Sequence, residues 1–168
     1  LVFIGAVVVF FVVQASKTEQ RMIERVGQIM TEDARDKIMV LTMSVMKSVA
    51  AGIKDVSSPD ERIAVIKKLV YDIRFEADQS GYMFVYQGTT NRVMPPKPSM
   101  EGTDLGELKD PNGLYLIREL RDAAAKGGGF VEYIFDKPGK GVQPKISYST
   151  MIPGTDMWVG TGVYLGNV

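Results

Sequence analysis

A helical spacing of apolar residues runs unbroken through the first third of this chain. Nine steps of three or four residues lead from Ile23 to Val56, about 3.7 residues a step. This is the period of one long and nearly straight helix, roughly 50 Å in length at 1.5 Å per residue. We therefore predict a long helix over residues 17–56, of a kind suited to transmitting a displacement along its axis.

An uninterrupted apolar run precedes this helix, from Leu1 to Val13, with no charged residue before Lys17. The run is shorter than the roughly 20 apolar residues that span a bilayer. Because helical spacing continues through it, we interpret residues 1–16 as the outer part of a transmembrane helix that begins upstream. The alternative is the core of a signal peptide. Either interpretation places residues 17–168 outside the cytoplasm.

Cap and turn residues divide the rest of the chain. Ser58, Pro59 and Glu61 form a helix start with a capping box, which predicts a short helix over 58–75. The segment 81–166 then predicts a sheet and one further helix. Alternation and turn chemistry indicate strands at 82–87, 92–94, 130–135, 143–151 and 157–164, a loop at 95–109, and a helix capped by Asp110. The expected fold is α+β, with an antiparallel sheet of about five strands.

Composition excludes several classes of function. The 20 basic and 20 acidic residues cancel, so no global field favours nucleic acid. The chain has no histidine and no cysteine, the residues on which zinc sites and nucleophilic triads most often depend. The acidic residues match no metal loop or paired-carboxylate spacing. We therefore predict no enzyme activity, no metal and no cofactor.

Aromatic residues and glycines mark two strands as the walls of a pocket. Tyr82 and Phe84 share one face of their strand, and Trp158 shares a face with Gly160 and Gly162. Glycines between aromatic residues leave hollow space against a sheet, and such glycines mark close approach of a ligand or of another backbone. The alternative is a bulge or tight helix packing.

Two basic residues are candidates for binding an anion at this pocket. Lys145 lies within an otherwise apolar and aromatic strand, where it either extends to solvent or neutralises an anion. Arg74 lies where the short helix meets the first strand, and its guanidinium matches a carboxylate. The alternative for Arg74 is an ordinary surface arginine.

Several of these segments, taken in order, resemble the single Cache sensor domain of bacterial chemoreceptors and sensor kinases, of the second single-Cache type. The similarity covers almost the whole chain. It rests on the segments Arg74-Phe75, Gly81 to Tyr86, Glu101-Gly102, Leu108 to Gly113, Gly127 to Tyr133, Pro144 to Tyr148 and Trp158 to Tyr164.

The resemblance implies a PAS-like sheet with the long helix packed on one face and a pocket for a small organic acid on the other. Arg74 and Lys145 would neutralise the carboxylate of acetate, propionate, lactate or pyruvate. The implied hydrogen-bond donors are Tyr82, Tyr133 and Tyr148, and the implied apolar wall is Phe84, Met94 and Trp158. Met94 stands where the family often has a polar residue, which makes this wall more apolar.

The resemblance also implies a sensor domain in the periplasm, anchored in the bacterial inner membrane and paired into a homodimer through the long helix. The loop 95–109 would close over the pocket when ligand binds. We predict that the domain serves a transmembrane chemoreceptor, and the alternative is a sensor histidine kinase or a cyclic-dinucleotide enzyme. An alternative of another class is a pilin-like structural subunit, which normally carries a glutamate early in its apolar segment. This chain has none before Glu19.

Overall fold

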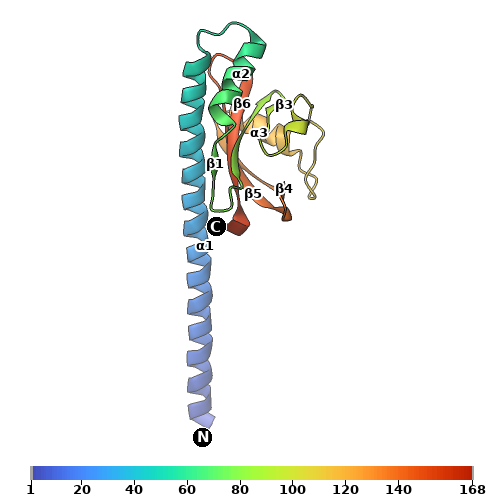
Figure 1. Cartoon of the computed structure of the whole chain (residues 1–168). Coiled ribbons are helices and arrows are strands. Elements are labelled where there is room, and N and C mark those ends of the chain that lie inside the picture. Colours follow the sequence, from blue (N-terminus) through green and yellow to red (C-terminus); the bar gives the residue numbers. More distant parts are fainter. Residues whose placement is uncertain (1, 168) are drawn as a thin grey trace.

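The computed structural model describes the backbone of residues 2–167 and the side chains of residues 20–22, 25, 27, 28 and 30–166. One long helix, α1 (Val2–Ile53), stands against one side of a sheet, and its N-terminal half extends well beyond it (Figure 1). The elements that follow are α2 (Pro59–Val70), β1 (Arg74–Phe75), β2 (Gly81–Gln87), β3 (Thr90–Val93), η1 (Pro98–Met100), α3 (Leu116–Ala125), β4 (Gly129–Lys137), β5 (Gly141–Met151), β6 (Met157–Tyr164) and η2 (Leu165–Asn167).

The sheet is antiparallel throughout, in the order β1-β2-β6-β5-β4, and β3 pairs with β2 outside this path. The strand that the sequence did not predict is β1, which falls inside the predicted helix 58–75. The helix ends at Val70 because the chain then turns back, so that Arg74 pairs with Tyr82 and Phe75 with Gly81.

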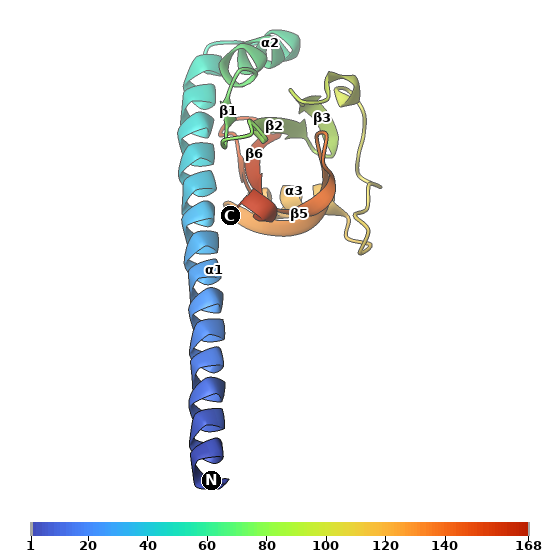
Figure 2. The same ribbon diagram turned by 60° about the horizontal axis from the view of Figure 1, so that its bottom comes forward.

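Helices cover both faces of this sheet, as Figure 2 shows. On one face α1 and α2 pack over alternate residues of β2 and β6, including Met83, Val85 and Val159. On the other face α3 packs over the intervening residues, among them Phe84 and Trp158. The predicted α+β class, with the long helix on one face, is confirmed.

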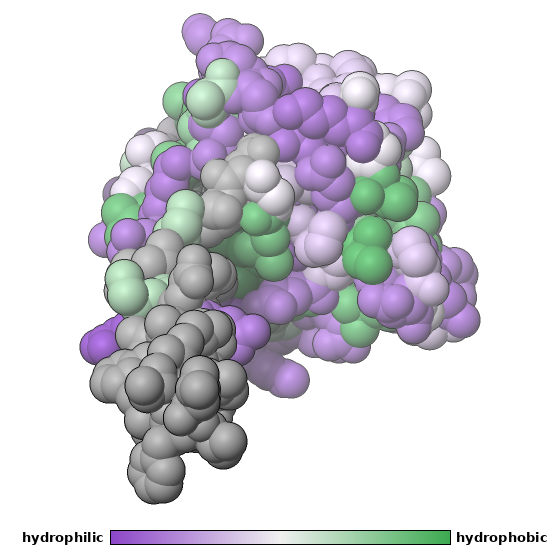
Figure 3. All heavy atoms as spheres, turned by 90° about the horizontal axis from the view of Figure 1, so that it is seen from below, coloured by the Kyte–Doolittle hydropathy of each residue, from purple (hydrophilic) through white to green (hydrophobic). Residues whose placement is uncertain are grey.

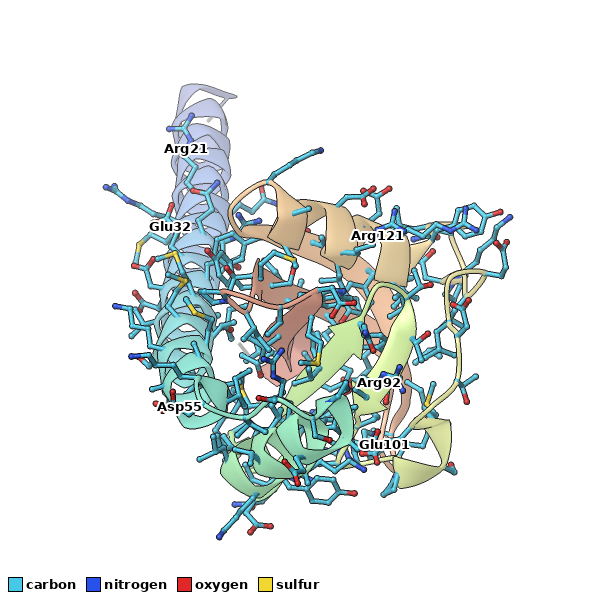
Figure 4. All side chains as sticks on the ribbon, turned by 90° about the horizontal axis from the view of Figure 1, so that it is seen from above. Arg21, Glu32, Asp55, Arg92, Glu101 and Arg121 are labelled. Atoms are coloured by element: carbon cyan, nitrogen blue, oxygen red, sulfur yellow. The ribbon has the colours of Figure 1, made fainter. Side chains whose placement is uncertain are left out.

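The predicted apolar stripe of α1 is buried from its middle to its end. Its buried apolar residues are Ala34, Ile38, Val45, Met46, Val49 and Ile53. Arg21 and Glu32 lie on the same helix toward its N-terminus (Figure 4). Residues 2–16 of the predicted membrane segment have a helical backbone, whereas residue 1 and the side chains of the segment lie outside the described residues. Within the described residues, no helix contains an apolar stretch of membrane-spanning length.

Seen along α1 from below, this end of the domain is mostly hydrophilic, and its apolar patches are small and separate (Figure 3). At the other end, α2 begins as predicted, with the Ser58 hydroxyl accepting from the Glu61 N–H and Pro59 at the first helical position. Lys67 of α2 forms an ion pair of 2.5 Å with Glu101, the residue after η1 (Figure 4). The loop 95–109 is therefore attached to α2.

Asp110 does not cap a helix, contrary to the prediction. Helix α3 begins at Leu116. The Asp110 carboxylate instead accepts from the N–H groups of Asn112, Leu114 and Ile134. Burial acts to raise the pKa of this carboxyl, but these N–H groups together hold the pKa below its ordinary value. Asp110 thus fixes the turn before α3 against the edge strand β4.

Helix α1 should be held to the sheet mainly by its buried stripe. Val49 is fully buried and Val40 is 61% exposed, so the same substitution can be compared on one helix. We expect Val49→Ala to lower the free energy of unfolding by about 2 kcal/mol in urea titrations. Val40→Ala should change it by less than about 0.5 kcal/mol. Equal effects would show that α1 is not docked in this way.

The carboxylate of Asp110 should stabilise the fold only where it is ionised. Because its folded-state pKa is depressed, its contribution is present above the unfolded pKa and is lost as the pH falls through the folded one. We expect Asp110→Asn to lower the urea midpoint at pH 7, and this difference to shrink on acidification. Asp72→Asn, at an exposed position, is the control and should have little effect at either pH.

Candidate functional site

Lys145 lies at the centre of a cage of aromatic rings on the α3 face of the sheet. Its side chain is only 1% exposed, and the ammonium donates to the Tyr82 hydroxyl at 3.0 Å. The Nζ atom lies 4.2 Å from the ring centre of Tyr82, 4.7 Å from Tyr164, 5.5 Å from Phe135 and 5.9 Å from Phe84. Three strands, β2, β4 and β6, therefore supply the rings that enclose this side chain of β5.

Among the described residues, none supplies a counter-ion for this ammonium in the cage. Within the described part of the chain, no carboxylate oxygen lies within 4.0 Å of the Lys145 Nζ atom. Burial lowers the pKa of Lys145 to about 7, because the charged form loses its hydration. The ring faces attract the cation but do not neutralise it. An anion entering the cage would supply the missing charge.

The tyrosines of the site are neutral at physiological pH and keep their hydroxyl protons. Burial raises the pKa of Tyr82 and Tyr133 well above the usual value, and that of Tyr164 to about 12. The hydroxyls of Tyr133 and Ser147 lie 2.8 Å apart, and the Tyr164 hydroxyl donates to the Asp136 carbonyl at 2.7 Å. Tyr82 and Tyr133 can therefore donate hydrogen bonds to a ligand without carrying charge, whereas the Tyr164 proton is already donated to Asp136.

Two cavities lie beside the cage. The loop-side cavity, of about 620 Å³, lies between the loop 95–109, the start of α3 and the β4–β5 hairpin and is partly open to solvent. Its walls are mostly apolar, with Lys97 and Lys109 as exposed cations. It is lined by Tyr82, Met94, Pro96, Lys97, Met100, Leu108, Lys109, Asp110, Pro111, Leu116, Ile134, Phe135, Asp136, Pro138 and Val142.

The edge cavity, of about 600 Å³, lies at the edge strand β4 and is lined by the turn 110–114, Leu165 and residues of β4 and β5. Of the predicted site residues, Tyr82 and Met94 line the loop-side cavity, and Tyr133 and Lys145 line the edge cavity. The hydrogen bond between Lys145 and Tyr82 joins the two groups. The structure thus brings these four residues together.

Phe84 belongs to the cage and Trp158 lies in the core beside it, but neither residue lines a cavity. Trp158 stacks on Tyr86 with ring centres 4.7 Å apart, and its indole N–H donates to the Gly88 carbonyl at 2.8 Å. The Phe84 ring packs edge-on against Trp158, with 6.1 Å between the centres. Both rings therefore pack in the core behind the residues that line the cavities.

The hollow space predicted beside the glycines of β6 is filled by the site's own side chains. A Cβ atom at Gly160 would lie 2.5 Å from the Phe84 ring, and one at Gly162 would lie 3.0 Å from Cε of Lys145. The glycines therefore make room for Phe84 and Lys145 rather than for a ligand.

Arg74 and Tyr148 lie away from the cage, contrary to the predicted arrangement. The Arg74 guanidinium donates to the carbonyls of Tyr71 and Ile73, and the residue lines neither cavity. Tyr148 packs on the α1 face, where its hydroxyl lies 4.0 Å from the Met43 sulfur. Since strand residues alternate between faces, Lys145 and Tyr148 cannot point to the same side.

Sequence reasoning missed two residues of the cage, Phe135 and Tyr164. Both could have been found by alternation, since Phe135 follows Tyr133 at a step of two and Tyr164 shares a face with Trp158. The loop residues Met100 and Leu108 of the cavity wall carry no such signal, because irregular backbone has no fixed period. Asp110 was noticed, but as a helix cap.

Curated relatives of this chain are membrane receptors with different output functions. The chain is 29% identical over 175 residues to the sensor histidine kinase MctS of Rhizobium johnstonii, covering all of this chain and 37% of that protein. It is 32% identical over 117 residues to the methyl-accepting chemotaxis protein CtpM of Pseudomonas aeruginosa, covering 68% of this chain and 20% of that protein. The chain thus spans well under half the length of either relative.

Solved structures with the same fold are sensor domains. A methyl-accepting chemotaxis protein of Vibrio parahaemolyticus superposes with a TM-score of 0.74 at 29% identity, covering 84% of this chain and 95% of that one. A periplasmic sensor domain of a chemotaxis protein gives 0.70 at 29% identity, covering 80% and 97%. A Cache chemosensory domain that recognises carboxylic acid gives 0.70 at 22% identity, covering 82% and 97%, and shares the fold.

The family model for single Cache domain 2 matches residues 28–168, which include the C-terminal half of α1, the whole sheet, the cage and both cavities. The sheet with α1 on one face and the cage on the other is the arrangement that the sequence resemblance implied. This chain belongs to the single Cache domain 2 family.

Proposed function

We propose that this chain is the ligand-binding input domain of a transmembrane bacterial receptor, and that it binds a small organic acid of two to four carbons through its carboxylate. The observation that supports this proposal most directly is the enclosed ammonium of Lys145, which has a hydrogen-bond partner but no counter-ion among the described residues. A carboxylate is an anion of the right size and geometry to pair with it.

The carboxylate enters through the loop-side cavity and meets the Tyr82 hydroxyl first, because Tyr82 lines that cavity. It then displaces the Tyr82 hydroxyl from Lys145 and accepts from both groups. Because Lys145 lines the edge cavity and not the loop-side cavity, a ligand coming from the loop side reaches it only when the Tyr82 side chain moves. The resulting ion pair is buried and supported by hydrogen bonds, the conditions under which such a pair is favourable.

The remainder of the ligand lies against apolar walls. Met94, Leu116 and Ile134 line the loop-side cavity near Tyr82, and Met94 is only 3% exposed. A short alkyl group buries apolar surface there, at about 25 cal/mol per Å². The more apolar wall that Met94 creates favours propionate over hydroxylated acids of similar size.

The loop 95–109 provides a route from the cavity to the helices. Glu101 accepts from the Met94 N–H at 2.9 Å and pairs with Lys67 of α2. Closure of this loop over a bound acid would pull on α2 and bias α1 between two positions.

The relatives suggest an output domain and a cellular location for this domain, and we state both as proposals. One curated relative is a chemotaxis receptor and the other is a sensor histidine kinase, so either output is compatible with this input domain. We infer an extracytoplasmic domain anchored through residues 1–16, with pairing of α1 into a homodimer as a further prediction. The family membership decides against the pilin-like alternative.

A thermal-shift screen tests the proposal. Acetate, propionate, lactate and pyruvate are each added to the folded domain, with chloride at the same ionic strength as the control. A ligand at about 100 times its Kd stabilises the folded state by about 2.7 kcal/mol, which raises the melting temperature by several degrees. If none of the four acids raises it at any concentration, the proposed ligand class is wrong.

Replacing Lys145 should separate binding from folding. Methionine has a similar length and no charge, so Lys145→Met removes the anion partner and also the cost of burying an ammonium. We expect carboxylate binding to fall by at least about a hundredfold in calorimetry, while the melting temperature of the ligand-free protein stays the same or rises.

The matched control is Lys68→Met, which removes an exposed lysine of α2. It should leave carboxylate affinity unchanged. Binding that survives Lys145→Met at full strength would assign the carboxylate to another group.

A further inference from the structure

The environment of Lys145 constrains its charge as well as its position. Its ammonium is enclosed by four rings, donates to one neutral hydroxyl and is almost inaccessible to water. An isolated charge in such surroundings is unfavourable, and lysine meets this cost by releasing its proton. The ligand-free site therefore favours the neutral amine as the pH rises.

The titratable groups that face Lys145 from the strands around it are tyrosines. From β2, β4 and β6 the titratable neighbours are Tyr82, Tyr133 and Tyr164, and burial raises the pKa of all three. Across the cavities lie the carboxylates of Asp110, Glu132 and Asp136 and the lysines 97 and 109, and Lys137 lies over the same Tyr164 ring as Lys145. Among the described residues, no carboxylate forms an ion pair with the Lys145 Nζ atom.

We propose that this site takes up one proton together with each carboxylate above neutral pH, so that it binds the equivalent of the undissociated acid. The inference rests on the proposed function and adds to it a dependence of carboxylate binding on pH. The ligand keeps its negative charge throughout. The proton comes from solvent and adds to the lone pair of the Lys145 amine, which becomes the ammonium of the ion pair.

The direction of the pH dependence follows from linkage. In the ligand-free protein the pKa of Lys145 is lowered to about 7, and a bound carboxylate raises it again by stabilising the charged form. Between these two values, binding requires proton uptake, so affinity falls as the pH rises, by up to tenfold for each pH unit. Below the lower value the amine is already charged and affinity is constant.

The consequence for a sensor is a response to acid concentration and to pH together. The same carboxylate concentration gives higher occupancy at acidic than at alkaline pH. An arginine in the cage would lack this property, because its guanidinium stays charged at all of these pH values.

Calorimetry on the whole chain tests the proposal, with whichever of acetate, propionate, lactate and pyruvate gives the largest thermal shift. We expect affinity to be about thirtyfold weaker at about pH 8.5 than at about pH 6. Titrations in two buffers of different ionisation enthalpy measure the number of protons taken up. They should report about one proton per ligand at the higher pH and about 0.1 proton per ligand at the lower pH. Equal affinities with no proton uptake would overturn the inference while leaving the proposed function intact.

A second measurement does not depend on any ligand. In protein carrying ¹³C at the lysine Cε position, the resonance that disappears in Lys145→Met should titrate with a midpoint near 7. A midpoint near the ordinary value of about 10.4 would overturn the inference. Lys145→Arg, if it binds the acid, should do so with an affinity that does not change between the two pH values. Failure of all four acids to bind at either pH would instead contradict the proposed function.

Discussion

The pairing of β2 with β6 is buried on both faces, and the other parts of the fold depend on this pairing. Because neither face reaches water, alternate residues must serve two different cores. Met83 and Val85 pack toward α1 and α2, while Phe84 and Tyr86 pack toward α3. The Phe84 ring lies so close to β6 that only glycine fits at position 160, where a Cβ atom would also meet the Tyr148 carbonyl at 2.8 Å.

The same alternation isolates Lys145. Its neighbours Ile146 and Tyr148 face α1, whereas Lys145 itself must lie on the α3 face among aromatic rings. An apolar residue there would stabilise the fold more, since a buried ammonium without an ion partner is unfavourable. The rings and the Tyr82 hydroxyl offset part of that cost. We propose that the remaining unfavourable energy is offset when a carboxylate binds, and that it couples carboxylate binding to proton uptake.

The cavity walls are linked to the helices by ion pairs at both ends of the sheet. Glu101 joins the loop above the cage to Lys67 of α2. At the other end Lys137, beside the cavity residues of the β4–β5 hairpin, pairs with Asp78 at 2.6 Å. The segment containing Asp78 also carries Glu76, which pairs with Lys37 of α1. These ion pairs connect the cavity walls to α1 and α2, which pack on the opposite face of the sheet. A change in the shape of the cavity can therefore be transmitted to both helices.

The sequence by itself determined the elements and the class of fold. Apolar spacing of about 3.7 residues specified α1, the Ser58 capping box specified the start of α2, and alternation located the strands within a few residues. These signals are local, because each depends on residues that are near neighbours in the chain. The two-residue strand β1 gave no such signal and was assigned to a helix.

Only the tertiary structure decided the composition of the site. Sequence could place Tyr82, Met94, Tyr133 and Lys145 near one another by resemblance, but it also added Tyr148 from the wrong face. Strand register, the ring positions around the Lys145 ammonium, and the absence of a carboxylate beside it among the described residues depend on contacts between distant segments. Those contacts have no period along the chain, and they decide whether a lysine in a strand is a solvated side chain or an enclosed cation.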